Sequence, residues 1–284
     1  MTLRTLVEQA EGELRFGPHP QRARLDAETL LLHLLKQNRA WLFAHSSDEV
    51  RTTAAEAFDA LVSRRLSGEP VQYITGSAEF FGLPFSVAPG VLIPRPETEL
   101  LVEEVLRLAN QIQQPRIADI GTGSGIIAIA LAHALPHARI TAVDLSKQAL
   151  TIAGKNALQN QVTNRITFVE GDLFAPLAGL SFDIIASNPP YVPEADRDSL
   201  SVEVREYEPE GALFAGEDGL SIYKRLIPEA REYLAPGGWL IMEIGYGQQP
   251  AIETILLVDG YREVYFVPDY QGIPRVACGQ KERG

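Results

Sequence analysis

The sequence predicts an α/β protein in which a mostly parallel sheet is covered by helices on both faces and preceded by a small helical bundle. Two observations lead to this class. From residue 116 onward, short apolar strands alternate with helical stretches, as they do in parallel sheets. Before residue 68, apolar residues recur only at helical spacing. Ligands of such sheets bind beyond the carboxyl ends of the strands, so a site is expected in the loops at that edge.

Residues 1–70 are expected to form a helical domain that docks a substrate. Leu30 and Leu34 are examples of apolar residues at four-residue spacing in this stretch. Ser47 or Asp48 is expected to cap the helix that follows them. We find no cluster of catalytic residue types here, which is why a docking or supporting role is predicted.

Residues 71–96 are rich in glycine and proline, and this composition predicts a β-hairpin linker. Glycines and prolines interrupt short β-like pieces at 79–81 and 85–87. A helix should begin near Pro96, because proline followed by acidic residues suits a first helical turn. Residues 97–284 then form the larger domain.

The larger domain is predicted element by element from its apolar pattern. Helices are expected at 126–135, 145–156 and 219–234. Strands are expected at 116–120, 139–143, 166–169, 182–187, 239–244, 263–267 and 275–278.

The composition limits the classes of function. The formal net charge is −12, whereas proteins that bind nucleic-acid phosphates usually carry a basic face, so we expect no stable nucleic-acid binding. No apolar run approaches the roughly 18 residues of a membrane span, and no signal-peptide pattern opens the chain. Cys278 is the only cysteine, so neither a disulfide nor a Cys-rich metal site is expected. We expect a cytoplasmic monomer without a metal.

A glycine-rich loop follows the first predicted strand of the larger domain. Glycines at alternate positions let the backbone turn sharply and approach a ligand closely. Ile126 breaks the dinucleotide pattern G-x-G-x-x-G, and no Lys-Ser/Thr pair follows as in a phosphate-binding loop. The candidate cofactor loop consists of Gly121, Thr122, Gly123, Ser124 and Gly125.

Two acidic residues extend this candidate cofactor site. Asp144 ends the next strand, where a carboxylate can accept hydrogen bonds from both ribose hydroxyls of a nucleoside. Asp172 follows a later strand and is a candidate for the adenine amino group, with Leu173 or Phe174 packing on the ring. These features describe an adenosine pocket without a pyrophosphate site, which S-adenosylmethionine fits better than NAD.

The tetrapeptide Asn188-Pro189-Pro190-Tyr191 is the candidate catalytic and substrate-binding segment. It follows the apolar strand 182–187, and its prolines stiffen the backbone. The side-chain oxygen of Asn188 and the carbonyl of Pro189 can accept both hydrogens of a planar NH₂ group, while Tyr191 offers a ring to stack on it. Catalysis would then come from positioning and preorganised electrostatics, without a charged general base.

These motifs together resemble those of the class I methyltransferases and, within them, the HemK/PrmC family. That family methylates N5 of a glutamine in peptide-chain release factors. The resemblance covers nearly the whole chain, and segments 73–80, 92–99 and 208–220 resemble signatures of the family. It implies a helical bundle, a hairpin linker and a seven-stranded Rossmann-like domain that uses S-adenosyl-L-methionine.

The resemblance also assigns roles to residues. It implies that Asn188, Pro189 and Tyr191 hold the substrate glutamine, which lies in the Gly-Gly-Gln loop of the release factor. Leu173 is a departure, because some relatives have tryptophan there and leucine stacks less well on adenine. The implied cofactor contacts are the loop 121–125, Asp144, Leu173 and Asn188.

Other readings of the same residues remain open. An adenine-N6 DNA or RNA methyltransferase would use the same tetrapeptide, although the acidic charge and the lack of a target-recognition domain disfavour it. A glutamine methyltransferase of a ribosomal protein is separated by the segment 95–99, Arg-Pro-Glu-Thr-Glu. A non-catalytic nucleoside-binding module is a further alternative, and a nicotinamide dehydrogenase is disfavoured by Ile126.

Overall fold

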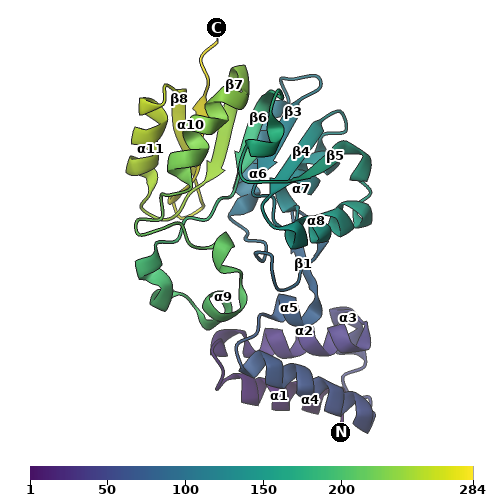
Figure 1. The fold of residues 1–284 in the computed structure, drawn as a ribbon. Coiled ribbons are helices and arrows are strands. Elements are labelled where there is room, and N and C mark those ends of the chain that lie inside the picture. The colour runs from purple at the N-terminus through teal and green to yellow at the C-terminus, as the bar shows by residue number, and fades with distance from the viewer. Residues whose placement is uncertain (284) are drawn as a thin grey trace. The chain divides into compact units, whose positions relative to one another are not determined.

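A computed structural model describes residues 1–283 of the chain, which divides into two compact units (Figure 1). The first unit comprises Met1–Ser77 together with Ser199–Tyr207. The second comprises Ala78–Asp198 and the chain from Glu208 onward. The short segment Ser199–Tyr207 therefore belongs to the N-terminal unit, although it lies within the second unit in the sequence.

The first unit is entirely helical, as its apolar spacing predicts. Leu6, Leu30, Leu31 and Phe58 lie at the centre of its core and are fully buried. Its α-helices are α1 (Leu3–Leu14), α2 (Ala23–Leu35), α3 (Arg39–Ala44), α4 (Thr52–Leu66), α5 (Val71–Thr75) and α9 (Val202–Tyr207), with a short 3₁₀ helix at Pro20–Arg22.

The predicted cap at Ser47 or Asp48 is wrong, because α4 begins only at Thr52. The backbone of residues 46–50 is used elsewhere. The carbonyl of Asp48 accepts a hydrogen bond from the Leu3 N–H at 3.0 Å, and Glu49 forms a β-bridge with Thr2. Extended pairing with the start of the chain therefore delays the helix.

A buried ion pair crosses the helical unit. The Arg65 guanidinium on α4 donates to the Asp26 carboxylate on α2 at 2.7 Å, and each side chain is only 2% exposed. Arg65 also pairs with Glu203 of α9. One guanidinium thus links three helices and explains why residues 199–207 belong to this unit.

The linker forms the predicted β-hairpin, with β1 (Ser77–Phe80) and β2 (Leu83–Ser86) starting two residues earlier than expected. Phe81 and Gly82 make the turn with positive φ angles of 52° and 70°. Phe80 and Phe85 are buried and meet edge to face, with ring centroids 6.2 Å apart. Glycine suits this turn because it has no Cβ to clash at positive φ.

The second unit contains a seven-stranded sheet of order β5-β4-β3-β6-β7-β9-β8, which confirms the predicted fold class. The first five of these strands run parallel, and β9 is antiparallel to both of its neighbours. The strands are β3 (Arg116–Ile120), β4 (Arg139–Asp144), β5 (Ile166–Glu170), β6 (Phe182–Ser187), β7 (Leu234–Glu243), β8 (Arg262–Pro268) and β9 (Pro274–Gln280).

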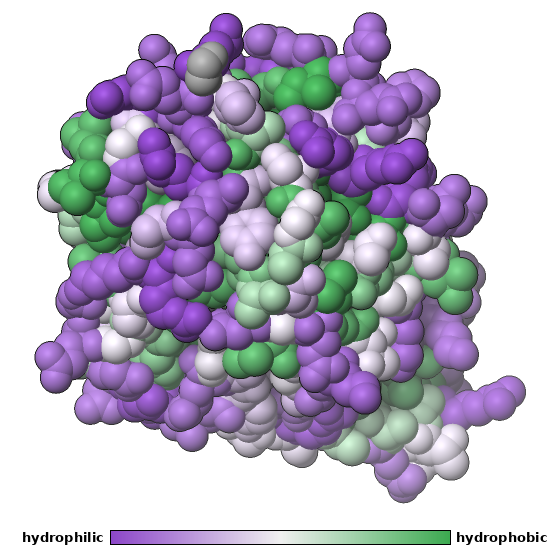
Figure 2. Space-filling view, turned by 45° about the horizontal axis from the view of Figure 1, so that its top comes forward, coloured by the Kyte–Doolittle hydropathy of each residue, from purple (hydrophilic) through white to green (hydrophobic). Residues whose placement is uncertain are grey.

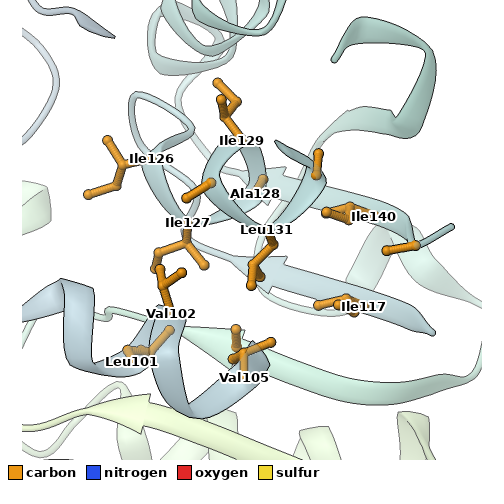
Figure 3. Close-up of a cluster of buried hydrophobic side chains, with 14 of the residues drawn as sticks. Leu101, Val102, Val105, Ile117, Ile126, Ile127, Ala128, Ile129, Leu131 and Ile140 are labelled. Atoms are coloured by element: carbon orange, nitrogen blue, oxygen red, sulfur yellow. The ribbon is translucent and has the colours of Figure 1, made fainter. Parts of the chain in front are cut away.

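Helices cover both faces of this sheet. On one face α6 (Thr98–Ala109), α7 (Ile126–Ala134) and α8 (Lys147–Gln159) share an apolar core with the strands. Figure 3 shows Val102 and Val105 of α6 beneath α7, beside the strand residue Ile117. The opposite face carries α10 (Tyr223–Tyr233) and α11 (Gln249–Val258) (Figure 1).

Two helical features of this unit differ from the prediction. The helix expected at 219–234 begins only at Tyr223, because Gly219 has a φ of 70° that continues a loop. The helix α11 was not predicted. Four short 3₁₀ helices complete the unit, at Thr163–Arg165, Ala175–Leu177, Glu194–Ser199 and Glu210–Ala212.

Several large apolar side chains are exposed, among them Phe16, Phe43, Tyr246 and Tyr270. On the face seen in Figure 2, hydrophilic residues predominate and hydrophobic ones form small, interrupted areas. Among residues 1–283, none of the helices has the length and apolar character needed to cross a membrane.

Candidate active site

A cavity of about 510 Å³ opens at the carboxyl ends of the parallel strands, where the α/β pattern predicts a site. Its walls come from the loops after β3, β4, β5 and β6, together with parts of the linker and of segment 208–212. The cavity brings together ten of the predicted site residues, namely Gly121, Thr122, Gly123, Ser124, Asp144, Asp172, Leu173, Asn188, Pro189 and Pro190. Gly125, Phe174 and Tyr191 do not line it.

The three glycines of the loop after β3 have two different structural roles. All have positive φ, at 75° for Gly121, 56° for Gly123 and 85° for Gly125. A Cβ on Gly121 or Gly123 would meet no protein atom within 4 Å, so both leave open space beside the cavity. A Cβ on Gly125 would lie 2.9 Å from Ile129 and 3.1 Å from Ala153. Gly125 therefore permits close helix packing, whereas the other two leave room for a ligand.

Asp144 holds the glycine loop from the neighbouring strand. Its Oδ2 accepts a hydrogen bond from the Gly123 N–H at 2.8 Å, and its Oδ1 accepts one from the Ser146 N–H at 2.8 Å. An ionised carboxylate has about four acceptor positions, so both oxygens retain capacity for a ligand. The residue lines the cavity.

Asp119 lies beneath the same loop and was not singled out from the sequence. It is fully buried, and its Oδ2 accepts hydrogen bonds from the Thr122 hydroxyl at 2.6 Å and the Ala128 N–H at 3.1 Å. Burial raises the pKa of this carboxyl to about 7. The sequence feature that could have revealed this role is the position of an aspartate within the apolar part of a strand, directly before the glycine loop.

The residues after β5 are placed differently from one another. The Asp172 carboxylate pairs with Arg225 at 2.6 Å, and about half of each side chain is exposed. Leu173 lines the cavity with a φ of 46°. The Phe174 ring is buried in the core and stacks on Tyr233, with centroids 5.0 Å apart. Of these two apolar residues, Leu173 is therefore the one that lines the cavity.

The backbone of the tetrapeptide 188–191 is held from both sides. Ser187, just before it, donates its hydroxyl to the Ile120 carbonyl at 2.7 Å and so ties β6 to β3. The Tyr191 carbonyl accepts a hydrogen bond from Gln248 Nε2 at 3.0 Å. A Cβ on Gly219 would lie only 2.4 Å from the same Tyr191 oxygen, so glycine is required there. These contacts give the segment a defined position.

Two side chains of the tetrapeptide are connected by hydrogen bonds to the buried carboxylate of Glu243, which the sequence did not reveal. Asn188 Nδ2 donates to Thr98 Oγ1 at 3.1 Å, and the Thr98 hydroxyl donates to Glu243 Oε2 at 2.6 Å. The Tyr191 hydroxyl donates to Glu243 Oε1 at 3.3 Å. Tyr191 is partly buried against the apolar core and does not line the cavity, and its stacking on the substrate stays a prediction.

Glu243 is fully buried at the end of β7, and burial raises the pKa of its carboxyl to about 7. The hydrogen bonds from Thr98 and Tyr191 lower this pKa, the charge of Glu97 raises it, and the charge of Arg275 lowers it. With this pKa, the carboxyl changes between its protonated and ionised forms near neutral pH.

The linker signature 92–99 and segment 208–220 meet at the cavity. The buried Glu208 carboxylate accepts hydrogen bonds from the Ile93 N–H at 3.2 Å and from Arg95 Nη2 at 2.5 Å. Pro209 and Ala212 line the cavity. The two segments therefore hold each other and form one wall.

The site joins an open glycine loop and a carboxylate to a stiff segment with amide acceptors. Such an arrangement suits a nucleoside-type ligand placed beside a planar NH₂ group. Within residues 1–283, no cluster of three or more His, Cys, Asp or Glu side chains is arranged to hold a metal ion.

Known proteins resemble the chain over its whole length. The family model described as the PrmC N-terminal domain matches residues 6–76, and the methyltransferase small domain matches residues 96–204. A release factor glutamine methyltransferase of Koribacter versatilis is 44% identical over 284 residues, covering 99% of each chain. Its counterpart from Geobacter sulfurreducens is 43% identical over 279 residues, covering 98% of this chain and 96% of the relative.

A solved structure has the same fold at low sequence identity. It is a methyltransferase from Pyrococcus furiosus, 19% identical, with a TM-score of 0.53 over 72% of this chain and 91% of that chain. The identities of the full-length relatives are high enough to decide the family. The chain belongs to the release factor glutamine methyltransferase family.

Proposed function

We propose that this protein transfers a methyl group from S-adenosyl-L-methionine to the N5 amide nitrogen of the glutamine in the Gly-Gly-Gln motif of peptide chain release factors. One observation carries the proposal. A single cavity joins the open glycine loop and Asp144 to the acceptors of Asn188 and Pro189, at the ends of adjacent strands. The family's full-length relatives, which are named for this reaction, support it.

The residues of the cavity fit the cofactor. Gly121 and Gly123 leave the space that a Cβ would fill, so the ligand would lie against their backbone. Asp144 would accept hydrogen bonds from the ribose hydroxyls, and Leu173 would contact the adenine. When bound, S-adenosylmethionine supplies an electrophilic methyl group.

Asn188 and Pro189 would hold the glutamine side chain. The amide nitrogen is a weak nucleophile because its lone pair is delocalised into the carbonyl. Asn188 Oδ1 and the Pro189 carbonyl would each accept one of its hydrogens, which orients the nitrogen and increases its electron density. Pro190 keeps this segment stiff, and most of the rate would come from this positioning.

The helical unit would dock the body of the release factor. We take residues 1–70 as the docking domain, 71–96 as the linker and 97–284 as the catalytic domain, which includes Gly125 and Phe174 as supports of the cofactor site. The net charge of −12 suits a protein substrate and disfavours stable binding of nucleic acid. We propose a monomer that acts in the cytoplasm, where translation terminates.

The test uses purified protein, labelled S-adenosylmethionine and a release factor. We expect one methyl group on the tryptic peptide that contains Gly-Gly-Gln, detected by mass spectrometry, and none on a control release factor in which that glutamine is alanine. DNA, RNA and ribosomal proteins serve as competing substrates. Transfer to one of these but not to the release factor would overturn the proposal.

A further inference from the structure

We propose that Thr98 and Glu243 are positioning residues that determine which end of the Asn188 carboxamide faces the substrate. The inference rests on the proposed function, because it concerns how the substrate amide is recognised. It names two residues outside the tetrapeptide and the glycine loop, brought to the site by α6 and β7.

A primary carboxamide can be turned to present either its oxygen or its NH₂ group. The substrate amide offers two N–H donors, so only the oxygen of Asn188 can accept from it. An Asn188 that presented its NH₂ group would place donors against donors and orient nothing. The site therefore needs a device that fixes one orientation of this side chain.

The hydrogen bonds from Asn188 to Thr98 and from Thr98 to Glu243 fix this orientation. An ionised carboxylate only accepts hydrogen bonds, so the single proton of the Thr98 hydroxyl is donated to Glu243 at 2.6 Å. The Thr98 oxygen can then only accept from Asn188, which lies at 3.1 Å. Asn188 must turn its NH₂ group toward Thr98, which leaves Oδ1 for the substrate.

When Glu243 is protonated, the same hydrogen-bond donors and acceptors no longer fix the orientation of Asn188. A carboxylic acid can donate to Thr98 Oγ1, which frees the Thr98 proton to bond to the Asn188 oxygen. The carboxamide then has two allowed orientations, one of which presents NH₂ to the substrate. The charge on Glu243 therefore selects the productive orientation.

Glu243 also holds the other end of the tetrapeptide. Its Oε1 accepts from the Tyr191 hydroxyl at 3.3 Å, and its backbone carbonyl accepts from the Tyr223 hydroxyl at 2.7 Å. The charges that act on it are those of Glu97, before α6, and Arg275, on β9. Together with burial and the hydrogen bonds from Thr98 and Tyr191, these charges set the pKa of Glu243. Because this pKa is about 7, the carboxyl gains or loses its proton near neutral pH.

Three variants test the inference in the full-length protein. E243Q removes the charge, T98V removes the hydroxyl at nearly constant shape, and T98S restores it. We expect E243Q and T98V to lower kcat on the order of 100-fold, the scale of a small misplacement of a reacting group, with the cofactor Kd unchanged. T98S should retain most of the wild-type kcat.

The pH profile separates positioning from a purely structural effect. For the wild type, we expect kcat to rise with pH along a limb centred near the Glu243 pKa of about 7. E243Q should lack this limb. E104Q is the matched control, because Glu104 is a buried carboxylate on α6 that pairs with Arg107 and does not line the cavity. It should keep both kcat and the limb.

A measurement without substrate tests the orientation directly. The side-chain NH₂ resonances of Asn188, followed by ¹⁵N NMR in the free protein, should titrate with pH in the wild type and stop titrating in E243Q. Fixed resonances in the wild type, or wild-type kcat in both E243Q and T98V, would overturn the inference. A wild type that titrates but methylates no release factor would instead refute the proposed function alone.

Discussion

The Asp144 carboxylate accepts a hydrogen bond from the Gly123 N–H at 2.8 Å, so the acid at the end of β4 holds the glycine loop that follows β3. Both residues line the cavity. The acid that is proposed to bind ribose therefore also shapes the loop that lies against the rest of the cofactor.

Asp144→Ala should weaken cofactor binding. A hydrogen bond to a charged group contributes about 1.5–3 kcal/mol. We therefore expect Kd for S-adenosylmethionine to rise by about 10- to 150-fold in titration calorimetry. Asp183→Asn is the control, because this aspartate pairs with Arg116 at the start of β3, at the opposite edge of the sheet. Equal affinities of both variants would contradict the assigned role of Asp144.

Asn188→Ala should separate chemistry from cofactor binding. The variant removes one of the two proposed acceptors for the substrate amide, and losing one preorganised polar contact at a reacting group costs about 100- to 1,000-fold in kcat. The cofactor Kd should change far less, because the glycine loop and Asp144 remain. Steady-state kinetics and calorimetry on the same preparation check both. Undiminished methyl transfer would rule out Asn188 as the substrate-holding residue.

Gly219→Ala should displace the tetrapeptide, because the new Cβ would lie 2.4 Å from the Tyr191 carbonyl. Gly82→Ala is a closely matched control: both glycines have a φ of 70°, but a Cβ on Gly82 would meet nothing within 4 Å. Both variants should lose on the order of 1 kcal/mol of stability from the positive φ. Only Gly219→Ala should also lose methyl transfer, as thermal unfolding and activity assays would reveal.

Asp119→Asn should flatten the dependence of stability on pH. The pKa of Asp119 is about 7 in the folded protein against an ordinary value of 3.8, so the unfolded chain binds fewer protons between these values. Its contribution to stability is therefore present below pH 4 and is lost as the pH rises through 7. Urea midpoints at pH 5 and pH 8 should differ less in the variant than in the wild type. Identical differences would show that Asp119 is not the titrating group.

Asp26→Ala should destabilise the helical unit without changing the cofactor site. Removing one partner of a buried ion pair costs about 3–5 kcal/mol when the other charge is left unpaired. Arg65 loses Asp26 but keeps its pair with Glu203, so the expected loss of stability lies below that range. Arg39→Ala is the control, since this arginine pairs with Glu28 at the surface and such pairs contribute about 0–1 kcal/mol. Below the unfolding transition, both variants should bind S-adenosylmethionine with wild-type affinity. A changed Kd for the Asp26 variant would contradict this division of roles.

Some elements could not be predicted from local pattern. The helix α11 (Gln249–Val258) lies between two strands and is only ten residues long, so its apolar run has no distinctive helical signature. Phe174 was a candidate for adenine because of its neighbours in the sequence. Its ring instead stacks on Tyr233 of α10, a packing partner that the sequence places far away.

The sequence alone determined the alternation of strands and helices, the glycine loop, Asp144 and the tetrapeptide. Each depends on residues that are adjacent or spaced by a helical or strand period, so local stereochemistry reveals them. Only the tertiary structure decided that Thr98 meets Glu243, 145 positions along the chain. A buried hydrogen-bond network depends on which strand ends and helix starts the fold brings together, and no spacing in the sequence encodes that proximity.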